Sequence, residues 1–168
     1  MVSEEWGAGV IYRHLLKADF ERLPRALRDF HATPGGGRAT GRVAVRHASA
    51  LARLLGMPPS GDDIPMQLEV IAEDHREVWI RRFGDVARRT VQYADGETLV
   101  ETIGPLRMHF RLIADNDGVR FECIRARLFG IPFPLRVNAA ERGGDSSWEF
   151  EVVVARIGSY RGVMSPVL

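Results

Sequence analysis

The spacing of hydrophobic and polar residues changes along the chain near residue 60. Before that point apolar side chains recur every three or four positions, and from residue 64 onward they recur at every second position. The first spacing is typical of amphipathic helices, and the second of strands with one buried face. We therefore predict an α+β protein in which two or three N-terminal helices pack on a curled, mostly antiparallel β-sheet.

The predicted helical region is divided. Within "AGVIYRHLLKADFERLPRALRDFHA" (8–32), one apolar face of a first helix is made by Val10, Ile11, His14 and Leu15. Pro24 clashes with the preceding turn in a helix interior, so we place it in the first turn of a second helix. The three glycines of "TPGGGRATG" (33–41) then end helical structure, because ordering them costs much backbone entropy.

A short third helix is predicted in "SALARLLGMPP" (49–59). Ser49 is a suitable N-cap and Gly56 a suitable C-terminal residue, directly before two prolines. The spacing of Leu51, Leu54 and Leu55 predicts that these three side chains face the core.

About eight short strands are predicted between residues 40 and 156, joined by turns such as "ADGE" (94–97) and "DNDG" (115–118). Such short connections imply antiparallel neighbours, since parallel strands need a crossover of a dozen or more residues. The two prolines of "GIPFPLRV" (130–137) restrict that segment to an edge or a bulge. No linker or repeat interrupts the chain, so we expect one domain over residues 1–168.

The stretch "ETIGPLRMHFRL" (101–112) alternates cleanly after Gly104-Pro105. Before this dipeptide the apolar residues occupy odd positions, and after it they occupy even positions. We interpret the change as one long strand with a bulge at Gly104-Pro105, as expected where a sheet curls into a barrel, a half-barrel or a helix-grip-like fold.

Composition narrows the function classes. The chain has 168 residues, of which 45% are hydrophobic and 27% charged, with a net charge of +1. This balance predicts no nucleic-acid partner and no strong attraction to an anionic membrane. One cysteine, Cys123, excludes an internal disulfide. The acidic start "MVSEEWGAG" and the lack of an apolar run of about 20 residues predict a cytoplasmic protein without a membrane span.

The polar face of residues 106–112 is the sharpest candidate site. Arg107, His109 and Arg111 project from one side of the predicted strand. Two guanidinium groups could hold a carboxylate or phosphate, with the histidine as a donor or general base. The alternative is that this face is simply solvated, and the sequence leaves the choice open.

A second candidate lies in "EVWIRRF" (77–83), where Trp79, Arg81 and Phe83 occupy alternate positions and so lie on one face of the predicted strand. An aromatic ring beside an arginine can form an amphipathic pocket wall through cation–π contact, although a strand buried on both faces would show the same pattern. Glu97 and Glu101 also share a parity, and we expect them to be solvated. The sequence contains no metal-ligand motif, so we predict neither a metal nor another cofactor.

Several stretches together resemble an uncharacterised bacterial domain-of-unknown-function (DUF) family: "LLKADFERLPRALRDFH", "GRVAVRH", "LARLLGMPP", "EVWIRRFG", "ETIGPLRMHFRL", "LFGIPFPLRV" and "WEFEVVVARIGSYRG". Members of that family are often fused to saccharopine dehydrogenase-like Rossmann domains. The resemblance therefore implies an oxidoreductase as a partner protein, and it implies no activity or catalytic residue. The chain itself lacks a dinucleotide motif, because "GGGRATG" follows a helix and precedes a strand.

These observations favour a non-catalytic domain that binds a small molecule in an apolar cavity, with an anionic amphiphile as the expected ligand class. The ligand contacts predicted are Arg107, His109, Arg111, Trp79 and Arg81. Two alternatives remain. One is an accessory domain that docks on an oxidoreductase, and the other is an isomerase- or hydrolase-type enzyme with His109 or His31 as the base.

Overall fold

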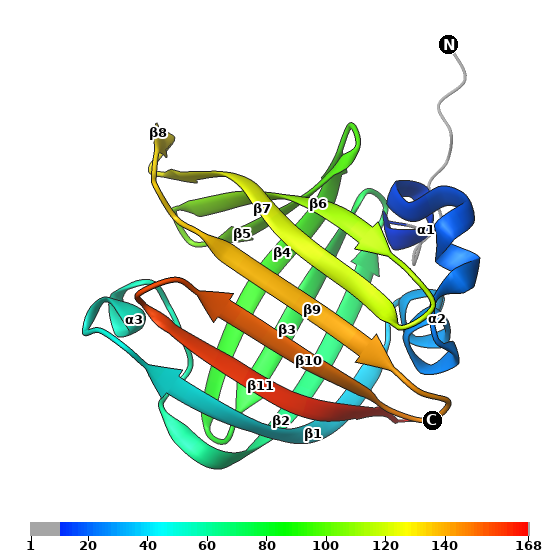
Figure 1. The fold of residues 1–168 in the computed structure, drawn as a ribbon, viewed down its shortest axis with the longest axis horizontal. Coiled ribbons are helices and arrows are strands. Elements are labelled where there is room, and N and C mark those ends of the chain that lie inside the picture. The colour runs from blue at the N-terminus through cyan, green and yellow to red at the C-terminus, as the bar shows by residue number, and fades with distance from the viewer. Residues whose placement is uncertain (1–10, 168) are drawn as a thin grey trace.

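A closed antiparallel β-barrel dominates the computed structural model, which describes residues 11–167 (Figure 1). Its ten strands are β1 (Arg38–His47), β2 (Gly61–Glu73), β3 (Arg76–Phe83), β4 (Val86–Asp95), β5 (Thr98–Ile103), β6 (Leu106–Ala114), β7 (Gly118–Leu128), β9 (Val137–Gly143), β10 (Trp148–Val154) and β11 (Gly158–Pro166). Successive barrel strands are neighbours, and β1 pairs with β11 to close the ring. The outer strand β8 (Ile131–Pro132) pairs only with β7.

The predicted antiparallel, curled sheet is confirmed, whereas the strand count and the balance of helix and strand need correction. About eight strands were expected, but ten form the barrel and one lies outside it. The fold is therefore predominantly β with a few short helices. Part of the difference arises because a two-residue turn at Gly104-Pro105 divides one expected strand into β5 and β6, and because β11 lies beyond residue 156, where the predicted strands ended.

Three short helices, α1 (Ile11–Leu16), η1 (Lys17–Arg22) and α2 (Arg25–His31), cover one end of the barrel, called here the helical end (Figure 1). Phe20, Leu27 and Phe30 are buried in the same core as the inward-facing strand residues. Pro24 directly precedes α2, one position earlier than predicted. Val10 and the segment "MVSEEWGAG" lie outside the described residues.

The opposite end of the barrel, called the α3 end, carries the helix α3 (Leu51–Leu54) between β1 and β2. Ser49 Oγ accepts a hydrogen bond from the Leu51 N–H at 3.0 Å, the contact expected of a capping side chain, although the N-cap position itself is Ala50. The predicted orientation is wrong, however, because Leu51 and Leu54 are exposed. A one-turn helix at the barrel rim buries only a narrow side, and here that side carries Ala52.

The segment around Gly104-Pro105 also differs from its prediction. It is a two-residue hairpin turn between β5 and β6 instead of a bulge within one long strand. Gly104 has a φ of +54°, which glycine adopts at little cost. Because Ile103 pairs with Leu106 across a two-residue turn, the inward parity changes from odd to even without any bulge.

The "GIPFPLRV" segment lies at the edge, as predicted. Its strand β8 is only two residues long, and Ile131 and Pro132 are both exposed. No helix within residues 11–167 is long and apolar enough to cross a lipid bilayer.

Candidate functional site

Polar side chains enter the barrel interior from three adjacent strands. Alternation along β3, β4 and β5 directs Arg81, Thr90 and Glu101 inward. These positions lie on the same parity as apolar core residues, including Trp79 on β3 and Leu99 on β5. Pairing of β3 with β4 and of β4 with β5 brings the three side chains together across the sheet.

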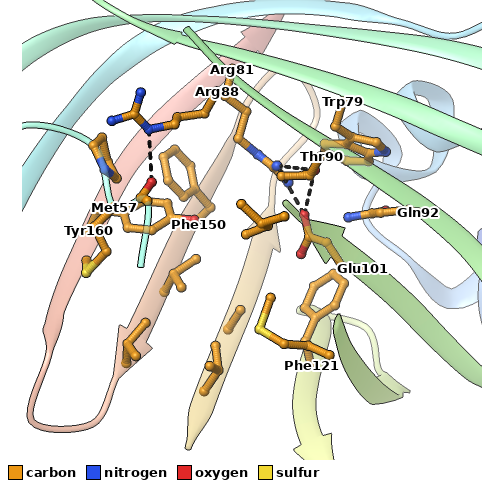
Figure 2. Close-up of a pocket in the computed structure, with 18 of the residues that line it drawn as sticks. Met57, Trp79, Arg81, Arg88, Thr90, Gln92, Glu101, Phe121, Phe150 and Tyr160 are labelled. Carbon is orange, nitrogen blue, oxygen red and sulfur yellow. Dashed lines mark hydrogen bonds and ion pairs between the residues drawn. The ribbon is translucent and has the colours of Figure 1, made fainter. Parts of the chain in front are cut away.

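The three side chains form one hydrogen-bonded cluster (Figure 2). Arg81 Nη1 donates to Thr90 Oγ1 at 2.8 Å and to Glu101 Oε1 at 3.1 Å. Thr90 Oγ1 in turn donates to Glu101 Oε1 at 2.7 Å. The Arg81 and Glu101 side chains are only 16% and 14% exposed. The cluster is therefore an ion pair largely removed from bulk water.

The charge of Arg81 is held in place by its surroundings. Burial lowers the pKa of this guanidinium, but the carboxylate of Glu101 and the neighbouring Tyr160 and Tyr12 more than offset that effect, so the pKa is raised overall. The guanidinium carbon also lies 4.9 Å from the ring centre of Trp79, within the range of a cation–π contact. Both interactions keep Arg81 charged and directed into the barrel.

A second polar group lies where the helices meet the barrel. Tyr12 Oη donates to Gln92 Oε1 at 3.0 Å, and the Tyr12 ring stacks on His31 with centroids 3.8 Å apart. His31 Nε2 lies 3.0 Å from Glu141 Oε2. Burial raises the pKa of Tyr12 well above its usual value, so the hydroxyl stays protonated and donates. These contacts anchor the helices to β4 and β9.

Glu77 is a further buried acid near these residues. Its Oε2 accepts a hydrogen bond from Trp79 Nε1 at 3.0 Å. Burial raises the pKa of Glu77, although the proximity of His31 and the bond from Trp79 oppose the rise. The bond fixes the indole ring whose face lies beside Arg81.

A cavity of about 150 Å³ remains inside the barrel next to the ion pair. Most of its wall is apolar, with side chains that include Met57, Met66, Leu68, Phe83, Ile103, Met108, Phe110, Phe121, Phe150 and Met164. Toward the helical end the wall is closed by buried residues such as Tyr12 and Trp148. Toward the α3 end, which no comparable set of helices among the described residues covers, the lining residues Leu55, Ile103 and Leu135 are only partly buried, so this is the less completely covered end of the cavity, called below its accessible side.

Several polar atoms reach this cavity without a protein partner. Among residues 11–167 the hydrogen bonds of the Arg81 side chain all come from Nη1, and none involves Glu101 Oε2 or the Tyr160 hydroxyl. In the same part of the chain every fully buried polar side-chain atom has a partner. The unused Nε and Nη2 of Arg81, Glu101 Oε2 and Tyr160 Oη therefore contact open space. Burial raises the pKa of Tyr160, which keeps its hydroxyl protonated.

A second arginine lines the cavity near the α3 end. Arg88 Nε donates to the backbone oxygen of Gly56 at 3.0 Å (Figure 2). Within the described part of the chain Arg88 forms no ion pair with a carboxylate. Its positive charge is thus available at the accessible side of the cavity.

The structure separates the five ligand contacts predicted from the sequence. Trp79 and Arg81 line the cavity. Arg107, His109 and Arg111 lie on the outer face of the barrel, because Leu106, Met108 and Phe110 take the inward positions of β6.

His109 is nevertheless shielded from solvent at this outer face. Its ring lies 3.0 Å from Arg125 Nη2 and 3.9 Å from a carboxylate oxygen of Asp95. Burial, the Arg125 charge and more distant arginines lower the pKa of His109 despite Asp95. The group that faces the cavity is thus Arg81 and not His109.

Sequence reasoning missed Thr90, Arg88 and Tyr160 as site residues, and the expectation that Glu101 is solvated is wrong. A signal for Glu101 was present, because it shares the parity of Leu99 and Ile103, which were both expected to be apolar-face residues. A charged residue on the apolar parity of a strand indicates either a buried pair or a site. Its partner on β3 could be identified only from the strand pairing.

The fold and the site together define a class: an antiparallel β-barrel, covered by helices at one end, with an apolar internal cavity beside a buried ion pair. Over residues 23–163 the sequence matches the family described as Domain of unknown function (DUF4166), and the chain belongs to that family. The predicted resemblance to a family of unknown function is thereby confirmed. No curated protein and no solved structure matches the chain.

Proposed function

We propose that the barrel binds a small amphiphilic molecule in its internal cavity. The observation that carries this proposal is the unused hydrogen-bonding capacity of Arg81, Glu101 and Tyr160 toward open space. A buried ion pair seldom adds stability compared with well-packed apolar residues. A pair that also borders unfilled space is better explained by recognition of a ligand than by core packing.

The cavity indicates the size of the ligand. Its volume is about 150 Å³. One water molecule needs about 10–15 Å³ of such volume, so the cavity has room for a ligand of on the order of ten non-hydrogen atoms. Met57, Met66 and Met108 line the wall, and flexible methionine side chains adapt to apolar groups of varied shape. The body of the ligand is therefore short and apolar.

The charges of the site indicate where the polar groups of the ligand bind. Arg81 is already neutralised by Glu101, so the deep cluster favours a neutral hydroxyl or carbonyl group that accepts from Arg81 or donates to Glu101. Arg88 has no carboxylate partner among the described residues and lies on the accessible side. An anionic group of the ligand is therefore expected at Arg88, which retains the predicted class of anionic amphiphile.

The two alternatives predicted from the sequence receive less support. His31 and His109 are both absent from the cavity wall, so a histidine-dependent reaction in this cavity is not favoured. An accessory domain that docks on an oxidoreductase should have a solid core and an exposed apolar patch along the "GIPFPLRV" edge. Ile131 of that edge is exposed, but the barrel holds a cavity, which favours ligand binding.

Calorimetric titration with octanoic acid, 1-octanol and octylamine tests the proposal. We expect the acid and the alcohol to bind and the amine to bind least. Arg88→Met should weaken octanoate about tenfold or more, the usual value of a hydrogen bond to a charged group, and leave octanol within about twofold. Arg107→Met, on the outer face, is the matched control. If none of the three compounds binds, or if Arg88→Met and Arg107→Met behave alike, the proposal is wrong.

A further inference from the structure

The most exposed large apolar side chains gather at the α3 end of the barrel. Leu54 is 80% exposed, Phe129 78% and Ile131 68%, which are the three highest values for large apolar residues in the described part of the chain. They come from two separate segments, because Leu54 lies on α3, whereas Phe129 lies on the turn before β8 and Ile131 begins β8. In Figure 1, α3 and β8 project at the end of the barrel opposite α1 and α2.

The backbone holds Phe129 in a conformation that bulky residues rarely adopt. Its φ is +51°, and Gly130 follows with +79°, so both residues of this tight turn are left-handed. A bulky residue in this region costs of order 1–3 kcal/mol and persists only when the surroundings impose it. Here the turn is secured by the Phe129 N–H, which donates to the Pro105 oxygen at 3.1 Å. The exposed phenylalanine is thus a fixed feature of the rim.

Charge is distributed unequally between the two ends of the barrel. The segments that join strands at the α3 end carry Arg53, Arg136 and Arg156, against a single acid, Asp85. The turns at the helical end carry Asp74, Glu97, Asp115, Asp117 and Asp145, with no lysine or arginine. None of the three arginines forms an ion pair with another described residue. The helices that cover the helical end (residues 11–31) add five basic and three acidic residues, so that end remains acidic by three charges, whereas the strand-joining segments of the α3 end are basic by two.

These features coincide with the accessible side of the cavity. The segment that follows α3 supplies Leu55 and Met57 to the cavity wall, and the segment that follows β8 supplies Leu135. The exposed apolar side chains and the unpaired arginines therefore surround the region through which a ligand would enter.

We propose that the α3 end of the barrel docks on the surface of an anionic lipid bilayer. Leu54, Phe129 and Ile131 would enter the boundary between headgroups and acyl chains, and the three arginines would contact lipid phosphates. The access side of the cavity would then face the membrane. Docking does not depend on the ligand proposed above, because it uses the rim and not the cavity wall.

Charge favours a bilayer over a second copy of this chain. A symmetric dimer through the α3 end would place the same arginines opposite one another, which is repulsive. An anionic bilayer offers negative charge and apolar depth at the same surface, and it accommodates apolar side chains that project from two separate segments.

Flotation of the full chain with lipid vesicles tests the proposal. We expect binding to vesicles of equimolar phosphatidylcholine and phosphatidylglycerol, and much weaker binding to phosphatidylcholine alone or at high salt. The triple variant Leu54→Ser, Phe129→Ser, Ile131→Ser should lose at least about tenfold in affinity, since each side chain buries apolar area in the bilayer. The matched control replaces exposed apolar residues on the barrel wall: Ile71→Ser, Ile124→Ser and Val163→Ser.

The arginines are tested separately. Arg53→Gln and Arg156→Gln should each reduce affinity for the anionic vesicles about fivefold, as expected for about 1 kcal/mol per basic residue near the surface. All replaced side chains are exposed, so unchanged thermal melting will confirm that the variants fold.

Three outcomes would overturn the proposal. The first is no binding to the anionic vesicles, and the second is equal loss in the triple variant and its control. The third is a wild-type dimer that the triple variant converts to monomer, measured by light scattering, which would assign the surface to self-association. A cavity variant, Arg81→Met with Glu101→Leu, should retain vesicle binding, so failure of the ligand proposal and failure of docking are distinguishable.

Discussion

Removing one partner of the Arg81–Glu101 pair should destabilise the fold strongly, whereas replacing both with apolar residues should change the stability little. Removing one partner of a buried ion pair leaves an uncompensated charge, which destabilises proteins by about 3–5 kcal/mol. The two side chains are 16% and 14% exposed and border a cavity, so the lower value of about 3 kcal/mol applies. We expect Arg81→Met and Glu101→Leu each to lower the melting temperature by about 6–12 °C, at about 2–4 °C per kcal/mol for a chain of this size.

The double variant Arg81→Met with Glu101→Leu should behave differently. It removes both charges and places apolar side chains of similar length in an apolar cavity, so its stability should lie within about 1 kcal/mol of the wild type or above it. The effect of the double variant should therefore differ from the sum of the two single effects by several kcal/mol, which is the coupling free energy between the two positions. At the same time the double variant should lose affinity for 1-octanol, because the hydrogen-bonding groups are gone.

Urea unfolding followed by tryptophan fluorescence measures these free energies, since Trp79 lies beside the pair and Trp148 is also buried. A loss of unfolding free energy below about 1 kcal/mol in both single variants would show that the pair is solvated and is not a buried recognition site.

Three further predictions concern other parts of the barrel. Burial raises the pKa of Glu77 in the folded protein above its unfolded value. The protonated Glu77 side chain therefore contributes stability at low pH, and this contribution is lost as the pH rises through the folded pKa. In urea unfolding, Glu77→Gln should be more stable than the wild type at pH 8 but not at pH 4. Gly36→Ala should lower the melting temperature far more than Gly35→Ala, because both have positive φ but only at Gly36 would the new Cβ lie 1.9 Å from the Val70 oxygen. Burial raises the pKa of the Cys123 thiol, so iodoacetamide should alkylate it more slowly in native than in denatured protein, as measured by mass spectrometry.

The strand segment "ETIGPLRMHFRL", with its basic polar face, shows how much a two-residue alternation can predict. The two-residue period correctly placed Leu106, Met108 and Phe110 on one face and Arg107 and His109 on the other. It could not decide which face meets a cavity, because both faces of a sheet obey the same period. Only closure of the barrel assigned the apolar face to the inside and the arginines to the outside.

The exposed leucines of α3 illustrate a different limit. Spacing alone predicted that Leu51 and Leu54 face the core, since apolar residues at helical spacing usually do. The helix spans one turn between adjacent strands at the barrel rim, and no other described element covers it. Whether an apolar stripe is buried depends on what packs against it, which is a property of the assembled fold.

The sequence by itself determined the local structure: the change from helical to strand period, the antiparallel pairing implied by short turns, the capping contact of Ser49 and the helix end at Gly56, and the edge position of the two-proline segment. Each follows from interactions between residues close together in the chain. The tertiary structure decided the closure of ten strands, the meeting of Arg81 with Glu101, the cavity beside them and the separation of charge between the two ends. These features depend on the pairing of strands far apart in sequence, whose register is fixed by the packing of the whole core and not by any one segment.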